Sequence, residues 1–159
     1  MDRKDDLKRL NDYIDSHRDE IVQFLVDFIA KKSVTYHEQD AVQFLREKME
    51  QFGFDEVRVD AVGNVLGRVG SGKKVLLYDS HIDTVEPGEE ADWGFDPLCA
   101  KIENGVIHGR GAVDDKGPLT AAVFAARALK ELGLDKEFTM WVSGSLCEED
   151  VEGSAVQAM

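Results

Sequence analysis

Two short apolar runs, at residues 75–78 and 138–142, lie on either side of a helical pattern, and each run leads into acidic residues. A continuous apolar run of this length is typical of a strand that is buried on both faces of an α/β sheet. Between the runs, apolar residues recur at helical spacing from Gly117 until Gly133 closes the pattern. Strand, helix and strand in this order predict an α/β fold in which a mostly parallel sheet carries helices on its faces.

The polar residues that follow the two runs are expected to lie together. His81 and Asp83 follow the first run, and Glu148 and Glu149 follow the second. The carboxyl ends of parallel strands meet at one edge of a sheet, where α/β proteins bind their ligands. Because burying such groups without partners costs several kcal/mol each, something must satisfy them there.

The rest of the chain predicts more helices and strands. Apolar residues at spacings of three and four predict two helices before about Lys32, broken near residues 15–17, and a third helix over 41–52. Runs rich in β-branched residues and bounded by glycines predict strands at about 55–61 and 64–69. An Asn-Gly pair predicts a hairpin over 98–108.

The last residues carry no signal that ends a helix. Residues 154–159 resemble the first turn or two of a helix, with no glycine, proline or basic residue to close it. We therefore expect residues 1–159 to be the front part of a longer polypeptide.

Composition excludes several classes of function. Nucleic-acid binding needs a positive surface, which 32 acidic residues against 19 basic ones, a net charge of −13, do not supply. No run approaches the roughly 18 apolar residues of a membrane span, and the N-terminus has no signal-peptide core. Two cysteines, Cys99 and Cys147, fit a reducing compartment. We expect a cytoplasmic protein with neither nucleic acid nor membrane as a partner.

The candidate site combines one imidazole with several carboxylates, contributed by His81, Asp83, Asp114, Asp115, Glu148 and Glu149. Gathered at one edge, these groups would repel one another unless a cation neutralised them, and nitrogen with oxygen ligands suits zinc or its neighbours. A two-metal centre, with ions about 3.5 to 4 Å apart, needs a carboxylate that bridges both. A charged loop in water explains each charge alone but not their convergence.

A cysteine hydrolase centred on Cys147 is an alternative at the same edge. Its neighbours Glu148 and Glu149 are negatively charged. Negative charge raises the pKa of a thiol and disfavours the reactive thiolate. The sequence therefore favours metal chemistry over a cysteine nucleophile.

Three ordered motifs resemble one family. They are Ser80-His-Ile-Asp-Thr84, Gly109-Arg-Gly-Ala-Val-Asp-Asp-Lys-Gly117 and the pair Glu148-Glu149 after a strand, with Trp93-Gly-Phe-Asp-Pro97 between the first two. The chain is similar to the co-catalytic zinc aminoacylase and carboxypeptidase family, which includes acetylornithine deacetylase, succinyl-diaminopimelate desuccinylase and glutamate carboxypeptidase. The resemblance implies a three-layer α/β/α catalytic domain with a mostly parallel mixed sheet, apparently truncated, of which residues 1–159 would be the N-terminal portion.

The resemblance also implies roles for individual residues. His81 would ligate one of two zinc ions, Glu149 would ligate the other, and Asp114 would bridge them, with Co²⁺ or Mn²⁺ as substitutes. Glu148 would be the general base, and Asp83 would hydrogen-bond the second nitrogen of His81. A cis peptide bond is implied between Asp114 and the next residue.

The activity that the resemblance implies is hydrolysis of an amide bond in an N-acyl amino acid or small peptide, as in a deacetylase or desuccinylase. A dipeptidase or aminopeptidase of the same family is one alternative, and an inactive fragment or metal-binding remnant is another. The family also uses a further acidic ligand, a late histidine ligand and a lid domain through which a homodimer forms. Because these would lie beyond Met159, we expect poor metal affinity and activity from the 159 residues alone.

Overall fold

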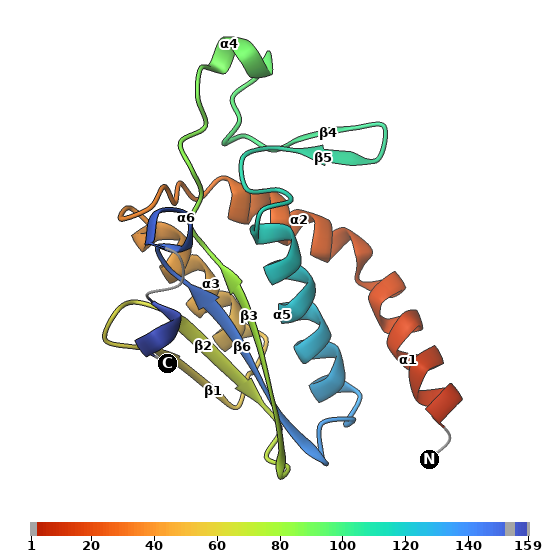
Figure 1. The fold of residues 1–159 in the computed structure, drawn as a ribbon. Helices are drawn as coiled ribbons and strands as arrows, with labels where there is room; N and C mark the ends of the chain where they lie inside the picture. Colours follow the sequence, from red (N-terminus) through yellow and green to blue (C-terminus); the bar gives the residue numbers. More distant parts are fainter. Residues whose placement is uncertain (1–2, 152–154, 159) are drawn as a thin grey trace.

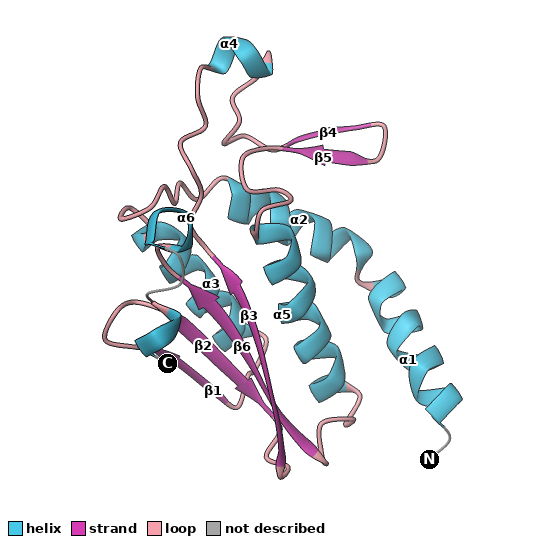
Figure 2. Ribbon diagram, in the orientation of Figure 1, coloured by secondary structure: helices cyan, strands magenta, loops and turns pink. Residues whose placement is uncertain are grey.

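The computed structural model describes residues 3–151 and 155–158, and the predicted helices and strands occur in the predicted order, together with two four-residue helices that were not predicted (Figures 1 and 2). The helices are α1 (Arg3–Ser16), α2 (Arg18–Ile29), α3 (Gln39–Gln51), α4 (Glu90–Trp93), α5 (Lys116–Glu131) and α6 (Glu148–Val151), with a short 3-10 turn at Val156–Ala158. The strands are β1 (Glu56–Val59), β2 (Val65–Val69), β3 (Lys74–His81), β4 (Lys101–Glu103), β5 (Val106–His108) and β6 (Phe138–Ser145). The break between α1 and α2 falls where it was predicted. The predicted helix over 154–159 lies partly outside the described residues.

The main sheet has four strands in the order β1-β2-β6-β3. β3 and β6 are parallel, as the strand, helix and strand pattern predicts, with Lys74 opposite Phe138 and His81 opposite Ser145. β2 is antiparallel to both β1 and β6. The α/β class with a mixed sheet is therefore confirmed, with one parallel and two antiparallel pairings in the described part of the chain.

One hydrophobic core joins the helices to one face of this sheet. Its buried side chains come from α2, α3 and α5 and from alternate positions of β2 and β6: Phe24, Phe28, Leu45, Met49, Val65, Val69, Leu119, Val123, Phe124, Met140 and Val142. Gly144 of β6 allows close packing, because a Cβ atom there would lie 2.6 Å from Leu45 Cδ2 and 2.8 Å from Ile82 Cδ1. Within the described residues the sheet and this helical layer make two of the expected three layers.

The apolar run of β3 is exposed, which corrects the expectation that it is buried on both faces. The exposed fractions of Val75, Leu76, Leu77 and Tyr78 are 70%, 54%, 49% and 40%. β3 is the outermost strand and pairs with β6 alone among the strands described. The run identified the strand correctly, but burial depends on what covers a strand, and a local sequence pattern does not contain that information.

The segment between β3 and α5 extends away from the sheet and carries α4 and the β4–β5 hairpin (Figure 1). Asn104 and Gly105 form the hairpin turn with φ values of 52° and 79°, as the Asn-Gly pair predicts. In the part of the chain that the structure describes, no helix has the length and apolar character to cross a membrane.

Candidate metal centre

The carboxyl ends of β3 and β6 bring the predicted site residues together. His81 is the last residue of β3 and lies opposite Ser145, the last residue of β6. After β6 the chain turns directly into α6, which begins with Glu148 and Glu149. The parallel pairing of the two strands therefore places an imidazole next to two carboxylates.

Three groups that are able to hold a metal ion converge at this edge. His81, Asp114 and Glu149 each offer one ligand atom, and these atoms all lie within 4.8 Å of one another. His81 Nε2 is 2.9 Å from Asp114 Oδ1 and 3.8 Å from Glu148 Oε2. The imidazole is buried, whereas the side chains of Asp114 and Glu148 are largely and half exposed. The ring is thus held by protein while the carboxylates face solvent.

Asp114 is placed by the loop that leads into α5. Its peptide bond to Asp115 is cis, as the resemblance implies. The hydroxyl of Ser80, in β3, donates to the main-chain carbonyl of Asp115 at 3.2 Å and also to its carboxylate. Asp115 therefore has a partner of its own on β3 and is not one of the three converging ligand groups.

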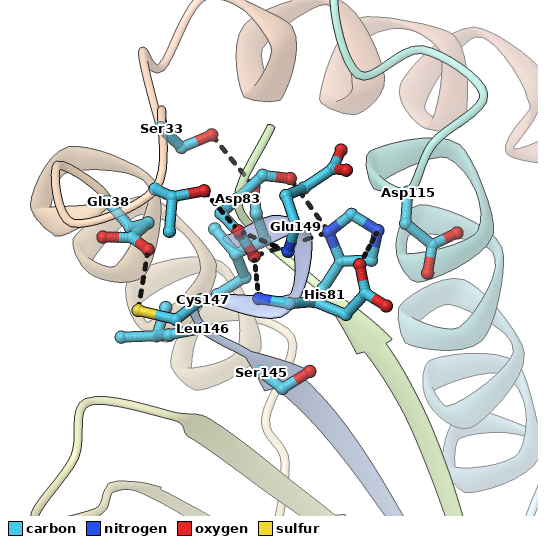
Figure 3. Close-up of polar contacts among 12 residues, drawn as sticks. Ser33, Glu38, His81, Asp83, Asp115, Ser145, Leu146, Cys147 and Glu149 are labelled. Atoms are coloured by element: carbon cyan, nitrogen blue, oxygen red, sulfur yellow. Dashed lines mark hydrogen bonds and ion pairs between the residues drawn. The ribbon is translucent and has the colours of Figure 1, made fainter. Parts of the chain in front are cut away.

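Asp83 is fully buried beneath the site, and its carboxylate accepts three hydrogen bonds (Figure 3). Oδ1 accepts the main-chain N–H of Glu148 at 3.0 Å. Oδ2 accepts the main-chain N–H of Glu149 at 3.2 Å and the hydroxyl of Thr35 at 2.8 Å. The buried charge is therefore satisfied by donors from two distant segments.

The contact between Asp83 and the imidazole differs from the one expected. His81 Nδ1 lies 2.9 Å from the main-chain carbonyl of Asp83, whereas the nearer carboxylate oxygen is 3.5 Å away. The carbonyl accepts the Nδ1 hydrogen, since a carbonyl cannot donate. This bond orients the ring so that Nε2 faces Asp114.

The charges of the site shift two pKa values strongly. Burial alone would lower the pKa of His81, but the nearby carboxylates of Asp83 and Asp114 outweigh it and raise that pKa to about 10. Burial alone would raise the pKa of Asp83, but the nearby imidazole of His81, together with hydrogen bonds from the two main-chain amides and Thr35, lowers it to about 2. Near neutral pH, the protein alone therefore holds an imidazolium against carboxylates.

We expect the zinc affinity of the chain to rise with pH. Below the pKa of about 10, His81 carries a proton that a metal ion must displace. Between about pH 6 and about pH 8, each pH unit should therefore strengthen binding by about tenfold. Competition with a chromogenic chelator at several pH values measures this slope. An affinity independent of pH would contradict the expectation, and His108→Asn, at an exposed histidine of β5, should leave the slope unchanged.

Cys147 does not support the cysteine-hydrolase alternative. Burial and the negative charge of Glu38 raise the pKa of its thiol. Its Sγ lies 3.6 Å from Glu38 Oε1 (Figure 3). A raised pKa leaves little thiolate at neutral pH, so the thiol is a poor nucleophile.

Sequence reasoning missed three buried polar residues that support the site: Ser33, Thr35 and Lys116. The first two fall between the second and third predicted helices, where the sequence predicts neither a helix nor a strand. Lys116 Nζ donates to the main-chain carbonyls of Phe28 at 3.0 Å and Lys31 at 2.7 Å, and burial lowers its pKa to about 7. It ties the start of α5 to the end of α2. No local signal marks this bond, because its partners are 88 and 85 residues away.

The donor set fits a divalent cation of the zinc type. One imidazole nitrogen and the carboxylate oxygens of two residues are typical zinc ligands. The hydrogen bond from His81 Nδ1 to the main-chain carbonyl of Asp83 is of the kind that orients a metal-binding histidine. A cation would also neutralise carboxylates that otherwise crowd one sheet edge.

Comparison with known sequences identifies relatives that are much longer. Residues 77–159 match the family described as "Peptidase family M20/M25/M40". A protein of Escherichia coli (strain K12) described as "Uncharacterized protein YgeY" is 38% identical over 147 residues, which are 92% of this chain and 36% of the relative. Succinyl-diaminopimelate desuccinylase of Xanthomonas campestris pv. campestris (strain B100) is 33% identical over 142 residues, 88% of this chain and 37% of the relative. The chain thus spans little more than a third of the length of these relatives.

Solved structures share the fold. Human carnosine dipeptidase 1 superposes with a TM-score of 0.77 and 23% identity, covering 95% of this chain and 36% of that one. The dipeptidase Dug1p of Saccharomyces cerevisiae gives a TM-score of 0.81 and 23% identity, covering 94% of this chain and 36% of its own. At this level of identity, the likeness shows a common architecture.

Proposed function

The chain belongs to peptidase family M20/M25/M40, and from this premise we propose that it is the N-terminal portion of the catalytic domain of a zinc-dependent amide hydrolase. The proposed substrates are N-acyl amino acids or small peptides. The observation that carries the proposal is the convergence of His81, Asp114 and Glu149, with Glu148 beside them. A cytoplasmic location is proposed because both cysteines are unpaired.

We assign His81, Asp114 and Glu149 as the residues that hold the metal. His81 would ligate one of two zinc ions and Glu149 the other. Asp114, whose exposed carboxylate converges with these two residues, would bridge the two ions. Co²⁺ or Mn²⁺ are the proposed substitutes, because they accept the same nitrogen and oxygen donors. The remaining ligands are proposed to come from a longer form of the polypeptide. A lid domain and a homodimer are proposed for that form on the family resemblance.

When bound, the metal would polarise the scissile carbonyl and lower the pKa of the attacking water. Glu148 is proposed as the general base, because its carboxylate lies 3.8 Å from His81 Nε2 and its side chain is half exposed. It removes the proton from the attacking water and then delivers that proton to the nitrogen of the leaving amine. Asp83 holds the main chain at Glu148 and also accepts from the next amide, so the base is kept beside the ligands.

An N-acyl amino acid is the substrate class we favour. The support is the 33% identity to a succinyl-diaminopimelate desuccinylase over most of the chain. The likeness to dipeptidases is a likeness of fold at 23% identity. A substrate panel that includes N-succinyl and N-acetyl amino acids alongside dipeptides separates the two classes.

The test uses the polypeptide that the natural reading frame encodes around residues 1–159, assayed on that panel with zinc and with a chelator. We expect turnover to fall by at least about 100-fold when the metal is removed and to return when zinc is restored. Turnover that survives complete metal removal would contradict the proposal. No turnover on any substrate would favour the inactive remnant.

A further inference from the structure

The buried carboxylate of Asp83 connects two segments of the site that are far apart in sequence. One carboxylate accepts the amides of Glu148 and Glu149 at 3.0 and 3.2 Å and the hydroxyl of Thr35 at 2.8 Å. The terminal torsion of an aspartate is soft, with broad minima, so a carboxylate adopts one plane only if its partners hold it there. Here the partners approach both oxygens.

Thr35 is held in place by a short strap, which we define as residues 33–35. The strap runs parallel to the segment that follows β3, with a bridge between Val34 and Thr84. Ser33 donates its hydroxyl to the carbonyl of Ile82 at 2.9 Å (Figure 3). The main-chain carbonyl of Ser33 accepts the N–H of Thr84 at 2.9 Å. Ser33 and Thr35 are both buried. The Thr35 hydroxyl is thus positioned by the contacts of the two preceding residues and by the stiff χ1 angle of a β-branched residue.

We infer that Thr35 is a positioning residue of the site, which acts through Asp83 to fix the main chain of Glu148 and Glu149. This inference rests on the proposed function for the roles of those two glutamates as base and ligand. An ionised carboxylate only accepts hydrogen bonds, so the Thr35 hydroxyl must donate. Without that donor, Oδ2 of Asp83 loses a buried partner, and the two amides alone are left to hold the plane of the carboxylate.

The strap supplies a matched control, because Ser33 and Thr35 are buried hydroxyl residues two positions apart. Ser33 donates its hydroxyl to the carbonyl of Ile82, after β3, and among the described residues the carboxylate of Asp83 accepts hydrogen bonds from Thr35, Glu148 and Glu149 instead. A residue that merely stabilises the strap would behave like Ser33. If a residue positions the site, its substitution must also change hydrogen exchange at the amides of Glu148 and Glu149.

The experiment measures amide hydrogen exchange by NMR in the polypeptide that the natural reading frame encodes around residues 1–159, without metal. Thr35→Val keeps the shape of the side chain but removes the hydroxyl, and it should speed exchange at the amides of Glu148 and Glu149 by about tenfold. Thr35→Ser keeps the hydroxyl and should restore protection, and Ser33→Ala should leave those two amides unchanged. If Thr35→Val does not fold, Thr35→Ala compared with Thr35→Ser isolates the same hydroxyl.

Zinc affinity, measured on the same variants, provides a second readout. Thr35→Val should weaken zinc binding by about 10- to 100-fold, as is typical when a group behind a metal ligand is removed, and Ser33→Ala should not. If the natural polypeptide without substitutions binds no zinc, the proposed function is in doubt, but the exchange rates still decide the role of Thr35. Unchanged exchange at Glu148 and Glu149 in Thr35→Val, or an equal change in Ser33→Ala, would overturn the inference.

Discussion

Replacing Glu148 with Gln is expected to lower amide hydrolysis by about 100- to 10,000-fold while leaving the bound metal in place. Glutamine has nearly the shape of glutamate but cannot take a proton from water at neutral pH. The main-chain N–H of Glu148, which donates to Asp83, is untouched by the change. The variant should therefore keep the turn that begins α6 and lose only the proton transfer. The turnover number and the metal content of the same natural polypeptide are the two measurements.

Glu149→Gln is the matched control for this result. It is the same chemical change at the adjacent residue, but Glu149 belongs to the group of converging ligand atoms. We expect this variant to lose metal together with turnover, whereas Glu148→Gln loses turnover alone. If Glu148→Gln kept more than about a tenth of the original rate, the general base would have to be another group.

Asp114→Asn is expected to weaken zinc binding by at least about 100-fold, more than the loss of an outer hydrogen bond normally causes. The substitution removes the negative charge 2.9 Å from His81 Nε2 and replaces a carboxylate that could bridge two ions by a neutral amide. It also removes one cause of the raised pKa of His81. Easier loss of the imidazole proton would strengthen zinc binding. We expect the loss of a ligand to weaken zinc binding by more than this. Isothermal titration with zinc measures the sum.

Asp115→Asn is the control for that measurement. The charge removed is the same and the position is adjacent, but Asp115 is bonded to Ser80 and is outside the converging ligand group. Its effect on zinc affinity should be small beside that of Asp114→Asn. Equal losses in the two variants would mean that net negative charge, and not a defined ligand, attracts the ion.

Much of this architecture could be predicted because its signals are local. The strand, helix and strand order implied the parallel pairing of β3 with β6, and this pairing brought His81 to Glu148 and Glu149. Glycine and Asn-Gly signals located the end of α5 and the turn of the β4–β5 hairpin. The family resemblance, and not the spacing, supplied the individual role of Asp114.

The parts that could not be predicted depend on partners distant in sequence. The burial of a strand depends on its neighbours, so the apolar residues of β3 were wrongly expected to be covered. Thr35 and Lys116 contact groups 48 and more than 80 residues away, and no periodicity marks such bonds. Whether His81 Nδ1 donates to the carbonyl or to the carboxylate of Asp83 depends on main-chain geometry, which residue types do not specify.

The pairing of β3 with β6 also has a consequence for the order in which the protein folds. The two strands are separated along the chain by α4, the hairpin and α5, so their pairing closes a long loop. Closing this loop costs chain entropy before the contacts between the strands can stabilise it. α1, α2 and α3 are local structures that are able to form earlier. The ligand atoms of His81 and Glu149 meet only when this late pairing is complete. An ion that needs both residues would therefore bind the folded state and not its precursors, and its binding would shift the equilibrium toward the folded state.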